Sequence, residues 1–208
     1  MLGHVRNQPP IASAPPASPE ARYAGRVSQP DPAEIVRPIL RARQVREFSG
    51  ELLDPAQLDA LTDAARWSGS SKNAQPWRFI VVRDPDRLRA LHEAGLPHTR
   101  SLGTAPAAIA IVMPAEQGRG ISLGYDEGRA AERILVAASM LGLGAGIAWV
   151  RGDAREAVAR VLGVPDDRFV RTVIAVGRPS EQARRPKSAP GQARLPRSET
   201  VFEDRWPG

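Results

Sequence analysis

A chain of 208 residues, 42% of them hydrophobic, can bury the core of one sizeable domain. Its lack of cysteine excludes disulfides, and the irregular spacing of its three histidines argues against a metal site. The net charge of +6 comes mainly from scattered arginines, which argues against nucleic acid as a partner and favours small phosphate-bearing molecules.

Residues 1–30 are rich in Pro, Ala and Ser, which predicts a disordered tail before a single domain at residues 31–208. These residues also lack the apolar core of a signal peptide, and no apolar run in the chain reaches membrane-spanning length. We therefore expect a cytoplasmic protein without a membrane partner. The first helix should begin at Asp31-Pro32, and Pro38 should bend or split it.

The next elements frame a polar loop. Asp54 to Gln57 has the residues of an N-cap, an N1 proline and a capping box, and the apolar residues that follow predict a helix with one buried face. Ser68–Lys72 offers hydroxyl and backbone N–H groups to a ligand. Pro76 blocks a return to helix, and the run from Arg78 to Arg83 predicts a buried core strand. The polar loop is therefore a candidate ligand site held between two rigid elements.

The middle of the chain predicts two helices and a strand. A helix should begin at Asp84-Pro85 and end near Gly95, and Ala107–Met113 predicts a second apolar strand. Only a short link, Pro114–Gly124, separates this strand from the next helix. That helix, Asp126–Leu141, is apolar on nearly every side, so we expect it to be buried all round and to have no polar face.

The stretch Gly142–Gly146 invites comparison with a dinucleotide-binding glycine motif. It follows a predicted helix and precedes a predicted strand at Ile147–Val150, the reverse of the order in that motif, so we interpret it as a helix C-cap. Asp153 should cap one more helix, and Arg171–Val176 predicts the last core strand. The polar tail that begins at Ser180 contains three apolar anchors: Val201, Phe202 and Trp206.

The loop and strand together read S-S-x-N-x-Q-P-W-x-F-x-V-V, which resembles the central motif of the nitroreductase family of flavoproteins. The residues that carry this motif are Ser70, Ser71, Asn73, Gln75, Pro76, Trp77 and Phe79. The resemblance extends to Arg41–Phe48, Tyr125–Val150, Val176–Pro179 and the basic tail near Arg194, and so spans most of residues 31–208.

The resemblance implies an α+β fold in which helices surround a mostly antiparallel sheet, and an intertwined homodimer with two FMN sites at its interface. It implies an FMN-dependent enzyme that passes reducing equivalents from NADPH or NADH to a small electron acceptor such as a nitroaromatic or quinone. Two alternatives stay open: flavin-dependent dehydrogenation of a peptide-like or cyclic dipeptide substrate, and a flavin-sequestering protein with little turnover.

The resemblance also implies a set of cofactor-binding residues: Arg41, Arg43, Gln44, Arg46, Ser70, Ser71, Asn73, Asp126, Ile147, Ala148, Trp149 and Arg194. Arg46 should lie near flavin N1/O2 and raise the reduction potential of the ring. Asp126 should lie near the ring, and an N–H within Ile147–Trp149 should face N5. The loop residues Ser70, Ser71 and Asn73 should reach the flavin of the other subunit. No side chain is expected to act as a catalytic acid, base or nucleophile.

The chain departs from the family pattern R-R-S-V-R-x-F at two positions. Ala42 stands where the first arginine is expected and Gln44 where serine is usual, so Arg41 or Arg43, with Arg194, would have to bind the flavin phosphate. Trp149 stands where many relatives have a smaller residue. Its indole could cover part of the flavin or turn into the core.

Overall fold

A computed structural model describes residues 30–115, 120–189 and 191–207. The described residues from Pro38 onward form the main compact unit, and those before Pro38 belong to a separate unit. Except for Pro30, the expected tail lies outside the described residues, so its disorder stays a prediction. The helices are α1 (Pro32–Arg41), α2 (Pro55–Arg66), α3 (Pro85–Ala94), α4 (Gly120–Met140), α5 (Arg155–Leu162) and α6 (Glu181–Arg184).

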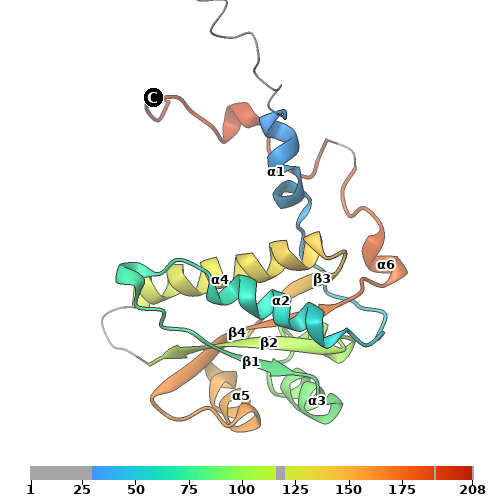
Figure 1. Ribbon diagram of the computed structural model, residues 1–208, viewed down its shortest axis with the longest axis vertical. Coiled ribbons are helices and arrows are strands. Elements are labelled where there is room, and N and C mark those ends of the chain that lie inside the picture. The colour runs from blue at the N-terminus through green and yellow to red at the C-terminus, as the bar shows by residue number, and fades with distance from the viewer. Residues whose placement is uncertain (1–29, 116–119, 190, 208) are drawn as a thin grey trace, which may run out of the picture. The chain divides into compact units, whose positions relative to one another are not determined.

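The centre of the main unit is a four-stranded sheet in the order β1-β2-β4-β3, with every neighbouring pair antiparallel. The strands are β1 (Arg78–Val82), β2 (Ala107–Pro114), β3 (Gly144–Trp149) and β4 (Arg168–Gly177). Helices α2 and α4 lie on one face of the sheet, and α3 and α5 lie on the other (Figure 1). The expected α+β class with a mostly antiparallel sheet is confirmed.

Strand burial follows from this order. Strands β2 and β4 lie inside the sheet and are covered on both faces, so their apolar residues are almost wholly buried. The prediction of a buried core strand for β1 is wrong. It pairs only with β2 and forms an edge, which leaves Val81 40% exposed while Phe79 and Ile80 are partly buried.

Two of the expected helix caps are confirmed and one is wrong. The Asp54 carboxylate accepts the N–H of Ala56, and Gln57 completes the capping box of α2. The Asp84 carboxylate caps α3. Asp153 does not cap α5, because its carboxylate pairs with the Arg151 guanidinium at 2.7 Å and a short 3₁₀ turn leads into the helix instead.

Two expectations about helices need correction. Helix α1 begins after Asp31 as expected, but it runs without a break through Pro38 rather than splitting there. Helix α4 begins at Gly120 rather than Asp126, and it is not buried all round. Its buried residues face α2 and the sheet, while the side left exposed in the single chain carries Arg129 and Glu132 among apolar residues, since residues three or four apart share one side of a helix.

Within the described ranges, no helix combines the length and the apolar character needed to cross a membrane. The same residues contain no cluster of three or more His, Asp or Glu side chains arranged to hold a metal ion.

Candidate active site

The glycine-rich stretch Gly142–Gly146 ends α4 and, within β3, lets a segment distant in sequence pack against the sheet. Gly142 has φ +71°, and the N–H of Leu143 donates to the Ala138 carbonyl at 2.8 Å, which confirms the helix C-cap. At Gly146, a Cβ atom would lie 2.0 Å from the Val45 carbonyl oxygen. The glycine at this position therefore permits Val45 to pack directly against β3.

The segment that contains Gln44 and Arg46 lies along β3 as a result. Gln44 forms a parallel bridge with Ala145, and the N–H of Val45 donates to the Ala145 carbonyl at 2.8 Å. The N–H of Ile147 donates to the side-chain Oε1 of Gln44 at 2.9 Å. The structure thus unites the predicted residues Gln44, Arg46 and Ile147, and the Ile147 N–H already has a protein acceptor.

Arg46 lines a cavity at the end of β3. This cavity of about 370 Å³ is lined by Arg46, Pro97, His98, Arg100, Ser101, Ile147 and Trp149. A neighbouring concavity of about 530 Å³ shares Arg46 and Arg100 and adds Gln44, Arg185 and Lys187. Glu47 is the one acidic residue among those lining the two spaces. The combined surface is therefore cationic, with the indole of Trp149 at one end.

Three of these basic residues were missed by sequence reasoning: Arg100, Arg185 and Lys187. Arg100 lies in a short 3₁₀ turn, the other two lie in the tail, and all three are far along the chain from Arg46, so only the fold brings them together. One sequence feature could have identified Arg100 as a site residue: it lies in the segment between α3 and β2, next to the sheet.

The arginines predicted to bind phosphate lie elsewhere in this structure. The Arg43 guanidinium donates to the carbonyls of Ala183 and Arg184, at 3.0 and 3.1 Å, and so ties this segment to the end of α6. Arg41 ends α1, and Arg194 is an exposed residue whose Nη1 donates to its neighbour's carbonyl. None of the three lines the two spaces around Arg46.

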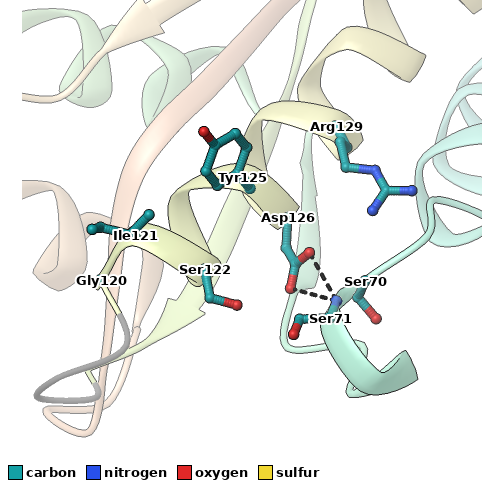
Figure 2. Close-up of a pocket in the computed structure, with 8 residues that line it drawn as sticks. All are labelled: Ser70, Ser71, Gly120, Ile121, Ser122, Tyr125, Asp126 and Arg129. Carbon is teal, nitrogen blue, oxygen red and sulfur yellow. Dashed lines mark hydrogen bonds between the residues drawn. The ribbon is translucent and has the colours of Figure 1, made fainter.

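The Ser/Asn loop forms a second group of predicted residues. A cavity of about 830 Å³ lies between this loop and the N-terminal half of α4. Ser70, Ser71 and Asp126 are among the residues that line it (Figure 2). The N–H of Ser71 donates to both carboxylate oxygens of Asp126, at 3.0 and 3.2 Å. Asp126 is only 3% exposed, so its carboxylate is directed to the loop.

The conformation of this loop is unusual. Lys72, Asn73 and Gln75 all have positive φ angles, of 52°, 53° and 47°, a region that side-chain-bearing residues rarely adopt. The Ser70 hydroxyl accepts the N–H of Gln75 at 2.9 Å, and the Asn73 and Gln75 side chains share a hydrogen bond of 3.2 Å. Asp126 and these contacts hold the loop in one shape, with Ser70 and Ser71 facing the cavity.

The predicted residues therefore fall into two groups that line different cavities. Arg46, Ile147 and Trp149 belong to one, and Ser70, Ser71 and Asp126 to the other. Asp126 groups with the loop rather than with Arg46. Ala148 is fully buried on the opposite face of the sheet, so only its backbone can serve the site.

Of the two alternatives for Trp149, the structure excludes the one in which the indole turns into the core. Its side chain does not enter the core: the residue is 47% exposed and lines the cavity beside Arg46. The guanidinium carbon of Arg171 lies 5.7 Å from the centre of the indole ring.

Comparison with known proteins places this fold and site in context. Residues 39–111 match the model of the nitroreductase family. A protein of Archaeoglobus fulgidus, provisionally named NADH dehydrogenase/NAD(P)H nitroreductase, is 30% identical over 158 residues, which cover 72% of this chain and 87% of that protein. The FMN reductase (NADPH) of Bacillus subtilis is 27% identical over 178 residues, which cover 76% of this chain and 71% of the reductase.

Solved structures agree with this result. An FMN-dependent nitroreductase of Clostridium difficile has a TM-score of 0.70 and 26% identity, over 81% of this chain and 98% of the other. The motif in the Ser/Asn loop, the arrangement of the sheet and these similarities together lead to one conclusion: the chain belongs to the nitroreductase family.

Proposed function

We propose that the protein is an FMN-dependent NAD(P)H oxidoreductase that works as a homodimer and reduces electron-poor acceptors such as nitroaromatics and quinones. The chain belongs to a family whose members include an FMN reductase (NADPH) and an FMN-dependent nitroreductase. The observation that carries the proposal is the cationic cavity at the end of β3, where Arg46 and Arg100 lie beside Trp149 and the backbone of Ile147.

The residues around this cavity fit FMN. A flavin mononucleotide needs cations for its phosphate, donors along its polar ring edge and a flat apolar surface. Arg46 and Arg100 can donate charge-assisted hydrogen bonds to the ring edge, and Trp149 offers an aromatic surface. Arg185 and Lys187 line the adjoining concavity and join Arg41, Arg43 and Arg194 as candidates for the phosphate.

When bound, FMN supplies hydride transfer between NAD(P)H and an acceptor. The protein's part is to bind and orient the reactants. The positive charge of Arg46 beside the ring edge would favour the reduced form and so raise the reduction potential. Trp149 would exclude water from one side of the cavity. These roles require no catalytic acid or base, in keeping with hydride transfer between stacked rings.

The dimer would complete the site. Ser70, Ser71 and Asn73 lie in a different part of the chain's surface from Arg46, so they would serve the flavin bound chiefly by the partner subunit. The exposed face of α4 supports an interface there, because Ile121, Tyr125 and Met140 are 82%, 74% and 69% exposed in the single chain. A helix with such apolar side chains is suited to packing against a second copy of itself.

The test is an absorbance spectrum of the purified protein, followed by anaerobic stopped-flow mixing with NADPH and with NADH. A yellow protein with about one FMN per chain that bleaches rapidly supports the proposal, and Arg46→Gln should then bleach more slowly. Tight FMN with slow bleaching would indicate a flavin-sequestering protein, and bleaching by a cyclic dipeptide alone would indicate a dehydrogenase. A colourless protein that fails to take up added FMN contradicts the proposal.

A further inference from the structure

Arg171 lies at a β-bulge in strand β4. Between β2 and β4, Ile111 pairs with Thr172 and the next residue, Val112, pairs with Val170, so Arg171 is an extra residue without a partner on β2. Such a β-bulge changes the direction of the side chain at that point and is common next to functional sites. Here the side chain is directed toward α4, where it meets Glu127.

Glu127 is an almost fully buried acid that holds the Arg171 side chain in place. It is 2% exposed, and its Oε2 accepts hydrogen bonds from both Nε (3.0 Å) and Nη2 of Arg171. A buried carboxylate is unfavourable unless it is paired, so the guanidinium cannot leave without a large cost. Among the described residues, no protein group bonds the other oxygen, Oε1, which makes Arg171 the main partner of this acid.

The fixed guanidinium lies beside the aromatic wall of the cavity. Its central carbon is 5.7 Å from the Trp149 ring centre and 5.7 Å from that of Phe169, within the range of a cation–π interaction. Trp149 is half exposed at the end of β3, and without such a contact its indole could change rotamer freely. The contact therefore restrains the one large aromatic side chain that lines the space beside Arg46.

We propose that Arg171, fixed by buried Glu127, is a positioning residue that holds the Trp149 indole as a wall of the cavity, and that Trp149 thereby selects planar aromatic acceptors. The part of this inference that concerns acceptor choice rests on the proposed function, since acceptor choice has meaning only for an oxidoreductase. The part that concerns the position of the Trp149 indole applies to the protein without FMN. A fixed indole offers a flat, electron-rich surface, which suits electron-poor planar rings.

The main test uses the double variant Glu127→Gln/Arg171→Gln, because Arg171→Gln alone would leave a buried charge and could prevent folding. The matched control is Glu156→Gln/Arg160→Gln, which removes an exposed ion pair on α5. The first readout is acrylamide quenching of Trp149 fluorescence in the protein without FMN. The Trp149 signal is obtained by subtracting the spectrum of the same protein that also carries Trp149→Phe.

In the double variant we expect the quenching constant of Trp149 to rise by about twofold, while the control stays unchanged. Unchanged quenching would overturn the positioning role. If the double variant does not fold, Arg171→Lys serves instead: it keeps the charge but loses the planar fork, and it should raise the quenching in the same direction. Unchanged quenching in Arg171→Lys would likewise overturn the role.

The second readout is steady-state kinetics with planar quinones and with ferricyanide, an acceptor that needs no aromatic wall. In the double variant, KM for the quinones should rise about fivefold with little change in kcat, and the ferricyanide rate should stay the same. In Trp149→Ala, KM for the quinones should rise by at least as much. Unchanged quinone KM values would overturn the selecting role. If the parent protein reduces neither the quinones nor ferricyanide, that result would count against the proposed function. The quenching result would still test the positioning of Trp149.

Discussion

Replacing Gly146 by alanine should separate the segment Gln44–Arg46 from β3. The added Cβ would lie 2.0 Å from the Val45 carbonyl oxygen, a backbone atom that cannot rotate away, so the segment must move. Two hydrogen bonds depend on its position, Val45 N–H to Ala145 and Ile147 N–H to Gln44, at 2.8 and 2.9 Å. At about 1 kcal/mol each, and with partial exposure of the buried Val45 side chain, we expect a loss of about 3 kcal/mol.

The measurement is thermal unfolding, combined with titration of FMN. A loss of about 3 kcal/mol should lower Tm by about 6–12 °C in a protein of this size. FMN affinity should fall by about tenfold or more, because Arg46 moves with the segment. The matched control is Gly152→Ala, where no atom lies within 4 Å of the new Cβ. If Gly146→Ala unfolds and binds FMN like the control, the close approach of Val45 does not hold the site together.

Four further predictions concern the site and the assembly. Arg194→Ala should weaken FMN binding by about tenfold or more, since a charge-assisted phosphate contact contributes about 1.5–3 kcal/mol, and unchanged affinity would show that the tail does not reach the phosphate. Asp126→Ala should cost about 1–3 kcal/mol in urea denaturation, because the Ser71 N–H loses its acceptor; a change within about 0.5 kcal/mol, roughly that of a neutral surface substitution, would argue against a structural role. Light scattering at low concentration should give the molar mass of a dimer, because obligate homodimers commonly bury more than about 2,000 Å² at their interface. A stable FMN-loaded monomer would refute an FMN site shared between two subunits. A panel of small quinones and nitroaromatics should show broad preference with high KM values, because β2 ends at Pro114 and α4 begins at Gly120, which leaves little chain to cover the ring; a thousandfold preference between close analogues would contradict this.

Local features of the fold were predictable from sequence because they depend on neighbouring residues. Asp54 and Gln57 cap α2, and Gly142 ends α4 with a positive φ, as their types and spacing indicated. The motif from Ser70 to Phe79 identified the family for the same reason, since it is one continuous stretch. Where a local signal competed with another, prediction was less secure: Asp153 resembled an N-cap, but Arg151 was close enough to bind its carboxylate.

Burial was harder to predict, because it depends on which elements become neighbours. The apolar sequence of β1 suggested a core strand, yet its place at the edge of the sheet leaves Val81 partly exposed. The many apolar residues of α4 concealed two charged residues, Arg129 and Glu132, which helical spacing places on the side that is exposed in the single chain.

By itself, the sequence determined most of the helix caps, the glycine turn, the family motif and most of the candidate residues, because each is encoded within a short stretch. The tertiary structure alone decided how those residues are grouped. It brought Arg100 and Lys187 to Arg46, joined Asp126 to Ser71, and set Arg171 between Glu127 and Trp149. Each of these contacts joins residues that are distant in sequence. They arise from strand register, from a β-bulge and from the packing of α4 on the sheet, and no local pattern specifies any of these.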